Sequence, residues 1–417
     1  MTPPPPVAAV QDRSAEIAAL ATTVLGFDTS NPPGETVEIV DWLDEWLTAI
    51  GLEPERVVTD PAKPNLVVTI PGERPETLLY LGHLDTVPYD PSEWEYDPLG
   101  ERVEERIYGR GATDMKGPMA AMLESIRAVA ETETVPPLTL ALALVSDEEV
   151  VGDAGLPAVM EADVLDADAC LIGETTCQGN NHSVTVADRG SIWLTLAASG
   201  TAAHGSRPML GENAIDRLYR GVERIRHQFG GRALEIPPAV EPIVEESVKY
   251  YAPVMDEETV RRLFEFPTIN LGTIEGGDAI NSVPTAARAE LDIRLTPGID
   301  TQTLLGELRG CVDSCPGVQI EDLSWSVGSY EKPDGSLVDA VASTAAEVTG
   351  DRIYRRSATG GGDAKKLRHA EISTVEFALG TDTVHANDEY TTVTALARNA
   401  EIYTRVPYVY AANVASE

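Results

Sequence analysis

The sequence predicts an α/β protein of two domains: a mixed-sheet α/β domain and a smaller ferredoxin-like domain inserted into it. The first observation is size, because 417 residues, of which 43% are hydrophobic, can form two cores. The second is that short apolar runs alternate with helically spaced segments towards both ends of the chain, which indicates a sheet covered on both faces. The third is a middle stretch whose elements follow the order β-α-β-β-α-β.

The alternation is clearest in the first part of the chain. Residues 1–10 are rich in proline, and we expect them to form a mobile tail. Helical spacing of apolar residues predicts helices at 15–25, 42–50 and 119–130. Apolar runs bounded by polar residues predict buried strands at 65–70, 77–81 and 138–145.

The pattern changes near residue 188 and returns after residue 329. The middle part predicts four strands and two helices, at 191–198, 213–229, 268–273, 286–294, 301–315 and 319–327. The last part predicts a helix, a glycine loop, a strand and a final helix, at 337–349, 360–362, 373–378 and 394–405. The simplest interpretation is one domain made of residues 1–187 and 329–417, with residues 188–328 inserted.

The charge balance argues against nucleic-acid partners and favours adaptation to high salt. Asp and Glu number 68 against 31 Lys and Arg, and only six of the basic residues are Lys, so the net charge is -37. A nucleic-acid binder needs a basic surface, so we expect no nucleic-acid partner, and anionic membranes are disfavoured for the same reason. Salt screens the repulsion within such a chain, which favours a halophilic protein over an ordinary acidic enzyme.

Cysteine content and the start of the chain point to the cytoplasm. The four cysteines include one C-x3-C pair without a second ligand pair nearby, so we expect reduced thiols rather than a zinc knuckle. The first residues, Met-Thr-Pro-Pro-Pro-Pro, have neither the basic region nor the apolar region of a signal peptide. No apolar run approaches 18 residues, so we expect no membrane span.

Residues of the types that commonly bind metals follow the predicted strands or precede the predicted helices. Taken singly, each is more simply a helix cap or a solvated loop residue. Taken together they indicate a site, because functional residues of such sheets gather where strands end in loops. Two His and several carboxylates suit a borderline metal such as Zn²⁺, and such sets can hold two ions ~3.5–4 Å apart. The residues are His83, Asp85, Asp114, Glu148, Glu149, Glu174 and His385.

Five ordered motifs resemble the M20 family of metallopeptidases and deacylases, which includes acetylornithine deacetylase, succinyl-diaminopimelate desuccinylase, aminoacylase and glutamate carboxypeptidase. The resemblance covers about residues 15–410, and five motifs in order are far more specific than one. The motifs are Gly82-His83-Leu84-Asp85-Thr86-Val87-Pro88, Gly109-Arg110-Gly111-Ala112-Thr113-Asp114-Met115-Lys116-Gly117, Asp147-Glu148-Glu149, Gly173-Glu174-Thr175 and His385-Ala386-Asn387-Asp388-Glu389.

The resemblance implies a site for two Zn²⁺ ions, with Co²⁺ or Mn²⁺ as alternatives. His83 and Glu174 are implied to be the terminal ligands of one ion. Glu149 and His385 are implied to be those of the other, and Asp114 the carboxylate that bridges both.

Two further carboxylates acquire catalytic roles from the resemblance. Asp85 is implied to orient His83, which fixes the tautomer of the ring and raises its basicity. Glu148 is implied to be the general base. It takes a proton from a water that the two ions acidify and returns it to the leaving amine.

The inserted domain resembles the lid and dimerisation domain of the family. His204, in Ala202-Ala203-His204-Gly205-Ser206-Arg207-Pro208, matches the histidine that crosses a homodimer to stabilise the oxyanion of the partner's reaction. The substrate contacts implied are Asn281, Arg294, Arg189 and Gly361 of the late glycine loop. Arg294 could equally serve an internal ion pair. The late glycine loop departs from the family pattern, because Lys365 stands where Arg is common. Lys cannot bind a carboxylate through two parallel hydrogen bonds as Arg does.

The sequence therefore predicts a dinuclear zinc hydrolase, cytoplasmic and homodimeric, that cleaves the amide bond of a small N-acyl amino acid in the manner of the biosynthetic deacetylases and desuccinylases. Two alternatives stay open. One is an aminopeptidase or carboxypeptidase of the same family, acting on a peptide. The other is a non-catalytic binding protein on the same fold, although such a protein would be expected to lack Glu148 or a metal ligand, and every position is filled.

Overall fold

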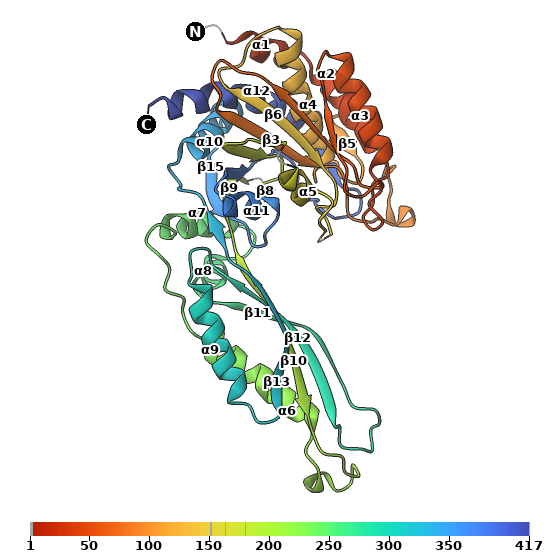
Figure 1. Ribbon diagram of the computed structural model, residues 1–417, viewed down its shortest axis with the longest axis vertical. Coiled ribbons are helices and arrows are strands. Elements are labelled where there is room, and N and C mark those ends of the chain that lie inside the picture. Colours follow the sequence, from red (N-terminus) through yellow and green to blue (C-terminus); the bar gives the residue numbers. More distant parts are fainter. Residues whose placement is uncertain (1–2, 151, 163, 180, 417) are drawn as a thin grey trace. The chain divides into compact units, whose positions relative to one another are not determined.

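The computed structural model of the protein describes residues 3–150, 152–162, 164–179 and 181–416. The chain divides into two compact units (Figure 1). The first comprises Met1–Val186, Glu331–Arg356 and Gly362–Glu417, and the second comprises Ala187–Tyr330 and Ser357–Gly361. The second unit thus interrupts the first in sequence and includes Gly360 and Gly361 of the late glycine loop.

A ten-stranded mixed sheet provides the core of the first unit, which confirms the predicted mixed α/β class. Its four central strands, β6, β3, β7 and β16, run parallel, and the strands that flank them are antiparallel. The order across the sheet is β1 (Glu55–Val57), β2 (Asn65–Ile70), β6 (Thr139–Val145), β3 (Thr77–His83), β7 (Ala169–Ile172), β16 (Ser373–Glu376), β9 (Asn181–Asp188) and β14 (Ser329–Tyr330), with β8 (Cys177–Gln178) and β15 (Ile353–Ser357) also paired to β9. Strand β14 and the two residues of β9 that pair with it are counted with the second unit.

Strand β3 explains why this sheet is covered on both faces. Successive side chains of a strand point to opposite faces. Leu79 and Leu81 pack into an apolar cluster with residues of α5 and α11, whereas the Tyr80 hydroxyl donates a hydrogen bond to the backbone oxygen of Tyr403 on α12. The helices of the unit are α1 (Pro5–Gln11), α2 (Ser14–Leu25), α3 (Val37–Ala49), α4 (Lys116–Glu131), α5 (Leu156–Glu161), α10 (Ser336–Thr349), α11 (Asp363–His369) and α12 (Val393–Val414).

The two ends of the chain differ from the expectation. The proline-rich start was predicted to be a mobile tail, but residues 5–11 form α1, whose Val7 and Val10 are buried. A Pro in the first turn of a helix removes only an amide that the helix leaves unpaired, so the proline run allows this helix to begin. Helix α12 also runs beyond the predicted end at residue 405, through Pro407, which is buried.

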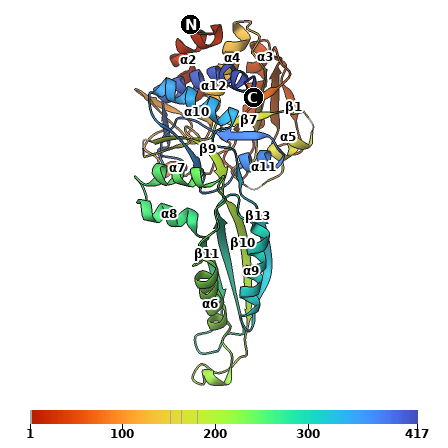
Figure 2. The same ribbon diagram turned by 90° about the vertical axis from the view of Figure 1, so that its left-hand side faces the viewer.

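The second unit has the predicted order of elements, with four antiparallel strands in the spatial order β11, β12, β10 and β13. Alternate residues of these strands pack with α6 and α9 into one apolar core, and Figure 2 shows these helices beside the long strands. The elements are β10 (Gly190–Ser199), α6 (Ala214–Arg224), a π-helix at Ile225–Phe229, α7 (Glu241–Tyr251), α8 (Glu257–Glu265), β11 (Thr268–Gly276), β12 (Ala286–Leu295), α9 (Thr301–Asp313) and β13 (Val318–Ser326). Sequence reasoning had assigned no element to α7 or α8.

A small third sheet supports the loops of the first unit. It consists of β17 (Tyr390–Thr392), β5 (Arg106–Tyr108) and β4 (Glu101–Val103), and two single 3-10 turns lie at Pro91–Glu93 and Pro208–Leu210. Within the described ranges, none of the helices is both long enough and apolar enough to cross a membrane.

Candidate metal centre

The parallel strands of the first unit deliver the predicted ligands to one edge of the sheet. Strand β3 ends at His83, and Glu174 follows the end of β7 by two residues. Glu149 follows the end of β6, and Asp114 lies just before α4. His385 comes from the loop between β16 and β17. The carboxyl ends of parallel strands meet at the same edge of a sheet, so residues far apart in sequence converge there.

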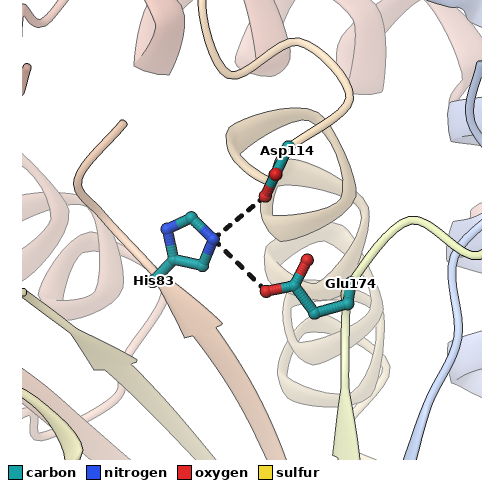
Figure 3. A group of neighbouring side chains, drawn as sticks. All are labelled: His83, Asp114 and Glu174. Atoms are coloured by element: carbon teal, nitrogen blue, oxygen red, sulfur yellow. Dashed lines mark hydrogen bonds and ion pairs between the residues drawn. The ribbon is translucent and has the colours of Figure 1, made fainter. Parts of the chain in front are cut away.

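Three of these residues form a first set around the His83 ring (Figure 3). His83 Nε2 lies 3.1 Å from Asp114 Oδ1 and 3.3 Å from Glu174 Oε1. The other ring nitrogen, Nδ1, lies 2.9 Å from the backbone oxygen of Asp85. A carbonyl oxygen can only accept, so the proton sits on Nδ1 and the Nε2 atom faces the two carboxylates.

A second set shares Asp114 with the first. His385 Nε2 lies 3.1 Å from Asp114 Oδ2 and 3.4 Å from Glu149 Oε2. Each oxygen of Asp114 therefore faces one histidine. Glu149 Oε1 is buried and has no hydrogen-bond partner among the residues that the structure describes.

The charges of the two sets match a pair of cations. Burial lowers the pKa of His83, but its hydrogen bonds to Asp114 and Glu174 outweigh burial and raise the pKa well above the ordinary value. Hydrogen bonds to Asp114 and Glu149 raise the pKa of His385 to about 10. In the chain by itself, the neighbouring carboxylates therefore favour the positively charged form of each ring. Two cations held by these sets would supply positive charge in place of the protons, so this nitrogen and oxygen donor set fits two divalent ions such as zinc.

Glu148 lies beside both sets and belongs to neither. Burial raises the pKa of its carboxyl to about 8; His83 opposes the rise, while Asp363, Asp114 and Glu149 add to it. The carboxylate lies against the glycine loop, where a Cβ added to Gly362 would be 3.0 Å from Glu148 Oε1. Glu148 is thus close to the ligand sets without being part of them, and its role as the base stays a prediction.

The side chain of Asp85 does not make the contact that the sequence suggested. Its carboxylate Oδ1 lies 3.7 Å from His83 Nδ1, beyond hydrogen-bonding distance, and it is the backbone oxygen of Asp85 that accepts from the ring. The carboxylate instead accepts from the backbone amides of Glu148 and Glu149, each at 3.1 Å. The main chain of Asp85 thus holds the His83 ring, and its side chain holds the backbone amides of Glu148 and Glu149.

Sequence reasoning missed Glu389, which organises the loop that carries Asp114. Its fully buried carboxylate accepts from Arg110 Nη1 at 2.6 Å and from the backbone amides of Gly111, Thr113 and Asp114 at 3.2, 2.8 and 3.0 Å. The motif that contains His385 also contains Glu389. An acidic residue four positions after the predicted ligand His385 was the available signal for Glu389. Its position in the sequence did not indicate that Arg110 and the Asp114 loop would be its partners.

His204 and Asn281 lie together in two loops of the second unit. The backbones of His204 and Ser282 form an antiparallel bridge, and the Gly205 amide donates to Asn281 O at 2.7 Å. His204 Nδ1 lies 2.8 Å from Ser206 Oγ. The ligands belong to the first unit, so the catalytic role of His204 and the substrate role of Asn281 stay predictions.

The two predicted substrate arginines also belong to the second unit. Arg294 Nε lies 2.8 Å from Asp292 Oδ1, the internal ion pair that the sequence left open as its alternative role. Arg189 donates to Arg294 O at 2.9 Å and to Thr268 Oγ1 at 3.1 Å, and burial lowers its pKa to about 10. Gly361 is the last residue of the loop segment in the same unit. The contacts described for both arginines are internal to the second unit, and binding of a substrate by these residues stays a prediction.

Comparison with known proteins decides the family. Residues 79–408 match the pattern of Peptidase family M20/M25/M40. The chain belongs to this family. It is 29% identical over 340 residues to acetylornithine deacetylase of Photorhabdus laumondii subsp. laumondii, covering 78% of this chain and 77% of that protein. It is 30% identical over 339 residues to succinyl-diaminopimelate desuccinylase of Dinoroseobacter shibae, covering 78% and 81%.

Solved structures share the M20 fold. The M20 metallo-carboxypeptidase of Sulfolobus solfataricus superposes with a TM-score of 0.78 at 19% identity, covering 95% of this chain and 99% of that one. Human carnosine dipeptidase 1 gives a TM-score of 0.73 at 16% identity, covering 99% and 100%. At such identities the likeness concerns the fold alone. As a member of the M20 family with the candidate site described above, the chain is a metal-dependent hydrolase of amide bonds.

Proposed function

We propose that this M20 hydrolase uses two zinc ions to cleave the amide bond of a small N-acyl amino acid, as a deacetylase or desuccinylase does. One observation carries the proposal. The two oxygens of Asp114 lie 3.1 Å from the Nε2 atoms of His83 and His385, and each histidine has a second carboxylate beside it. A shared carboxylate between two such sets is what a co-catalytic pair of ions requires.

The chain's own residues would perform the proton transfers. His83, Glu174 and Asp114 would hold one ion, and Asp114, Glu149 and His385 the other. When bound, the two ions would polarise the scissile carbonyl and make a water more acidic. Glu148 would take a proton from the water that attacks the carbonyl carbon and deliver it to the nitrogen as the C–N bond breaks. The second water proton leaves the new carboxyl group for the amine, so the products are a carboxylate and a protonated amine.

The sequence relatives favour a deacylase over a peptidase. The relatives named as a deacetylase and a desuccinylase are 29% and 30% identical to this chain, and each match covers 78% of it. A non-catalytic protein on this fold is disfavoured, because the base and the residues of both ligand sets are present.

The second unit would complete the active site in a homodimer. His204 would reach the partner subunit's ions and donate a hydrogen bond to the oxyanion that forms as water attacks. Asn281, Arg189, Arg294 and Gly361 would contact the carboxylate of the substrate. Arg294 would first have to leave Asp292, with which it now pairs.

A hydrolysis screen tests the proposed function. The protein, loaded with Zn²⁺, Co²⁺ or Mn²⁺ in molar salt, is incubated with N-acetyl, N-succinyl and N-carbamoyl amino acids and with dipeptides, and released amine is measured. We expect release from an N-acyl amino acid, which Glu148→Gln abolishes. Cleavage of dipeptides alone would favour the peptidase alternative, and no cleavage with any metal would overturn the proposed substrate class.

A further inference from the structure

Behind the ligand-bearing turn that follows β6 lies a buried hydrogen-bond network in which only Asp85 has been given a role in the reaction. It links four side chains from separate parts of the first unit: Asn31, Lys63, Asp85 and Asp147. Asn31 and Asp85 are 2% and 0% exposed, and Asp147 is 7% exposed. Burying charged groups at such depth is costly unless they are paired, so the network requires a compensating role or strong internal bonds.

The Asp85 carboxylate is the end of the network nearest the chemistry. Its Oδ1 accepts from the Glu148 amide and its Oδ2 from the Glu149 amide, so one carboxylate fixes two successive peptide units. The first peptide unit carries the proposed base and the second carries a proposed ligand. A shift of Asp85 would therefore move both.

Asn31 links Asp85 to a second carboxylate. Its Nδ2 donates to Asp85 Oδ2 at 2.8 Å and to Asp147 Oδ1 at 3.0 Å. Only the NH₂ end of the amide has two hydrogens to give, so the two acids determine how the amide is oriented. Gly34 makes room for this amide, because a Cβ there would lie 2.7 Å from Asn31 Cγ.

Lys63 holds the other end of the network. Its Nζ donates to Asp147 Oδ1, and the two side chains are 16% and 6% exposed. Asp147 has φ 64°, a left-handed backbone that non-glycine residues adopt rarely. This bend directly precedes Glu148. A Cβ at Gly152 would lie 1.8 Å from Asp147 Oδ2, so glycine is needed where that backbone closes on the carboxylate.

We propose that Lys63 and Asn31 are positioning residues that hold Glu148 and Glu149 in place, Lys63 by fixing the Asp147 bend and Asn31 by tying Asp147 to Asp85. The inference rests on the proposed function, since it assigns a purpose to the position of the base and of one ligand. It makes the second ligand set, which contains Glu149, depend on Lys63. The first set, His83 with Asp114 and Glu174, does not depend on it.

The test is a titration of the metal-free protein with Co²⁺. Binding is monitored by calorimetry and by the absorption bands of the bound ion. The variant is Lys63→Met, which keeps the length of the side chain and removes its charge. We expect two Co²⁺ sites in the wild type and a 10- to 100-fold weaker second site in the variant, the usual effect of losing a residue that supports a ligand. With saturating Co²⁺, kcat should fall by a similar factor while KM stays within about twofold.

Three further variants make the result specific. Lys63→Arg keeps the charge and should recover most of the second site. Asn31→Asp keeps the shape of the side chain but replaces the donor by an acceptor. It should show the same selective loss of the second site, so it serves as the test if Lys63→Met does not fold. Lys249→Met removes an exposed lysine that pairs with Glu246 in the second unit and should leave both sites unchanged.

The outcomes separate the inference from the function on which it rests. Suppose that the wild type has two sites and that Lys63→Met binds both ions and turns over as the wild type does. This result overturns the positioning role and leaves the proposed function standing. Equal weakening of both sites, or the same loss in Lys249→Met, also overturns it. A wild type that binds fewer than two Co²⁺ ions overturns the two-metal proposal and the inference with it.

Discussion

Glu389→Gln is the sharpest test of how the Asp114 loop is held. The Arg110 and Glu389 side chains are 3% and 0% exposed, and their ion pair spans 2.6 Å. The substitution keeps an oxygen for the backbone amides of Thr113 and Asp114 but removes the negative charge opposite Arg110. Removing one partner of a buried ion pair costs about 3–5 kcal/mol, because the other charge is left buried without compensation.

The assay is urea unfolding of the metal-free protein at fixed salt, followed in parallel by tryptophan fluorescence and circular dichroism. Coincident curves establish that one transition is being compared. Glu307→Gln is the matched control, since Glu307 pairs with Arg232 where the two side chains are 37% and 53% exposed, and such pairs contribute about 0–1 kcal/mol. If Glu389→Gln lowered the free energy of unfolding by no more than this control, the reasoning would be refuted.

Four further predictions concern catalysis, metals, salt and assembly. Glu148→Gln should keep the metal content and lower kcat by ~10²–10⁴, the range for a lost general base, and near-normal turnover would place the base elsewhere. Asp114→Asn should lower the affinity for both ions, because each oxygen of Asp114 faces one histidine; elemental analysis that finds two ions retained after dialysis would contradict a bridging role. The melting temperature should rise between low and molar KCl as salt screens a net charge of -37, and an unchanged value would reject the halophilic interpretation. Mixing His204→Ala with Glu148→Gln subunits should restore up to half of the wild-type activity per heterodimer, since one site then carries both lesions and the other neither; no recovery would mean that His204 acts within its own subunit.

The ligand-bearing turns could be predicted because their signals are local. An apolar run of the length of one strand indicates that the strand is buried. His83, Glu149 or Glu174 close to the end of such a run indicates where the strand stops. Parallel strands bring their carboxyl ends to one edge, so convergence followed from the order of elements. The ordered motifs then implied which residue would serve which ion.

Local signals were weaker for elements that have no clear periodicity. Helix α1 begins in a proline run, which a first turn tolerates but which does not by itself indicate a helix. Helix α12 continues through Pro407 against the usual preference of proline, and the burial of this part of the helix outweighs that preference. Helices α7 and α8 lie between two predicted elements, in a stretch for which sequence reasoning assigned none.

Sequence by itself determined the class of the fold, the order of the four strands of the second unit's sheet and the residue types at the strand ends, because periodicity and turn residues record which side chains are buried and where strands stop. Only the tertiary structure decided which buried polar groups meet. Asn31 reaches Asp147 across 116 residues, Arg110 reaches Glu389 across 279, and the Asp85 carboxylate binds two backbone amides rather than the histidine beside it. A hydrogen bond depends on the position of two atoms to within a fraction of an ångström, and no pattern along one segment carries the position of the other.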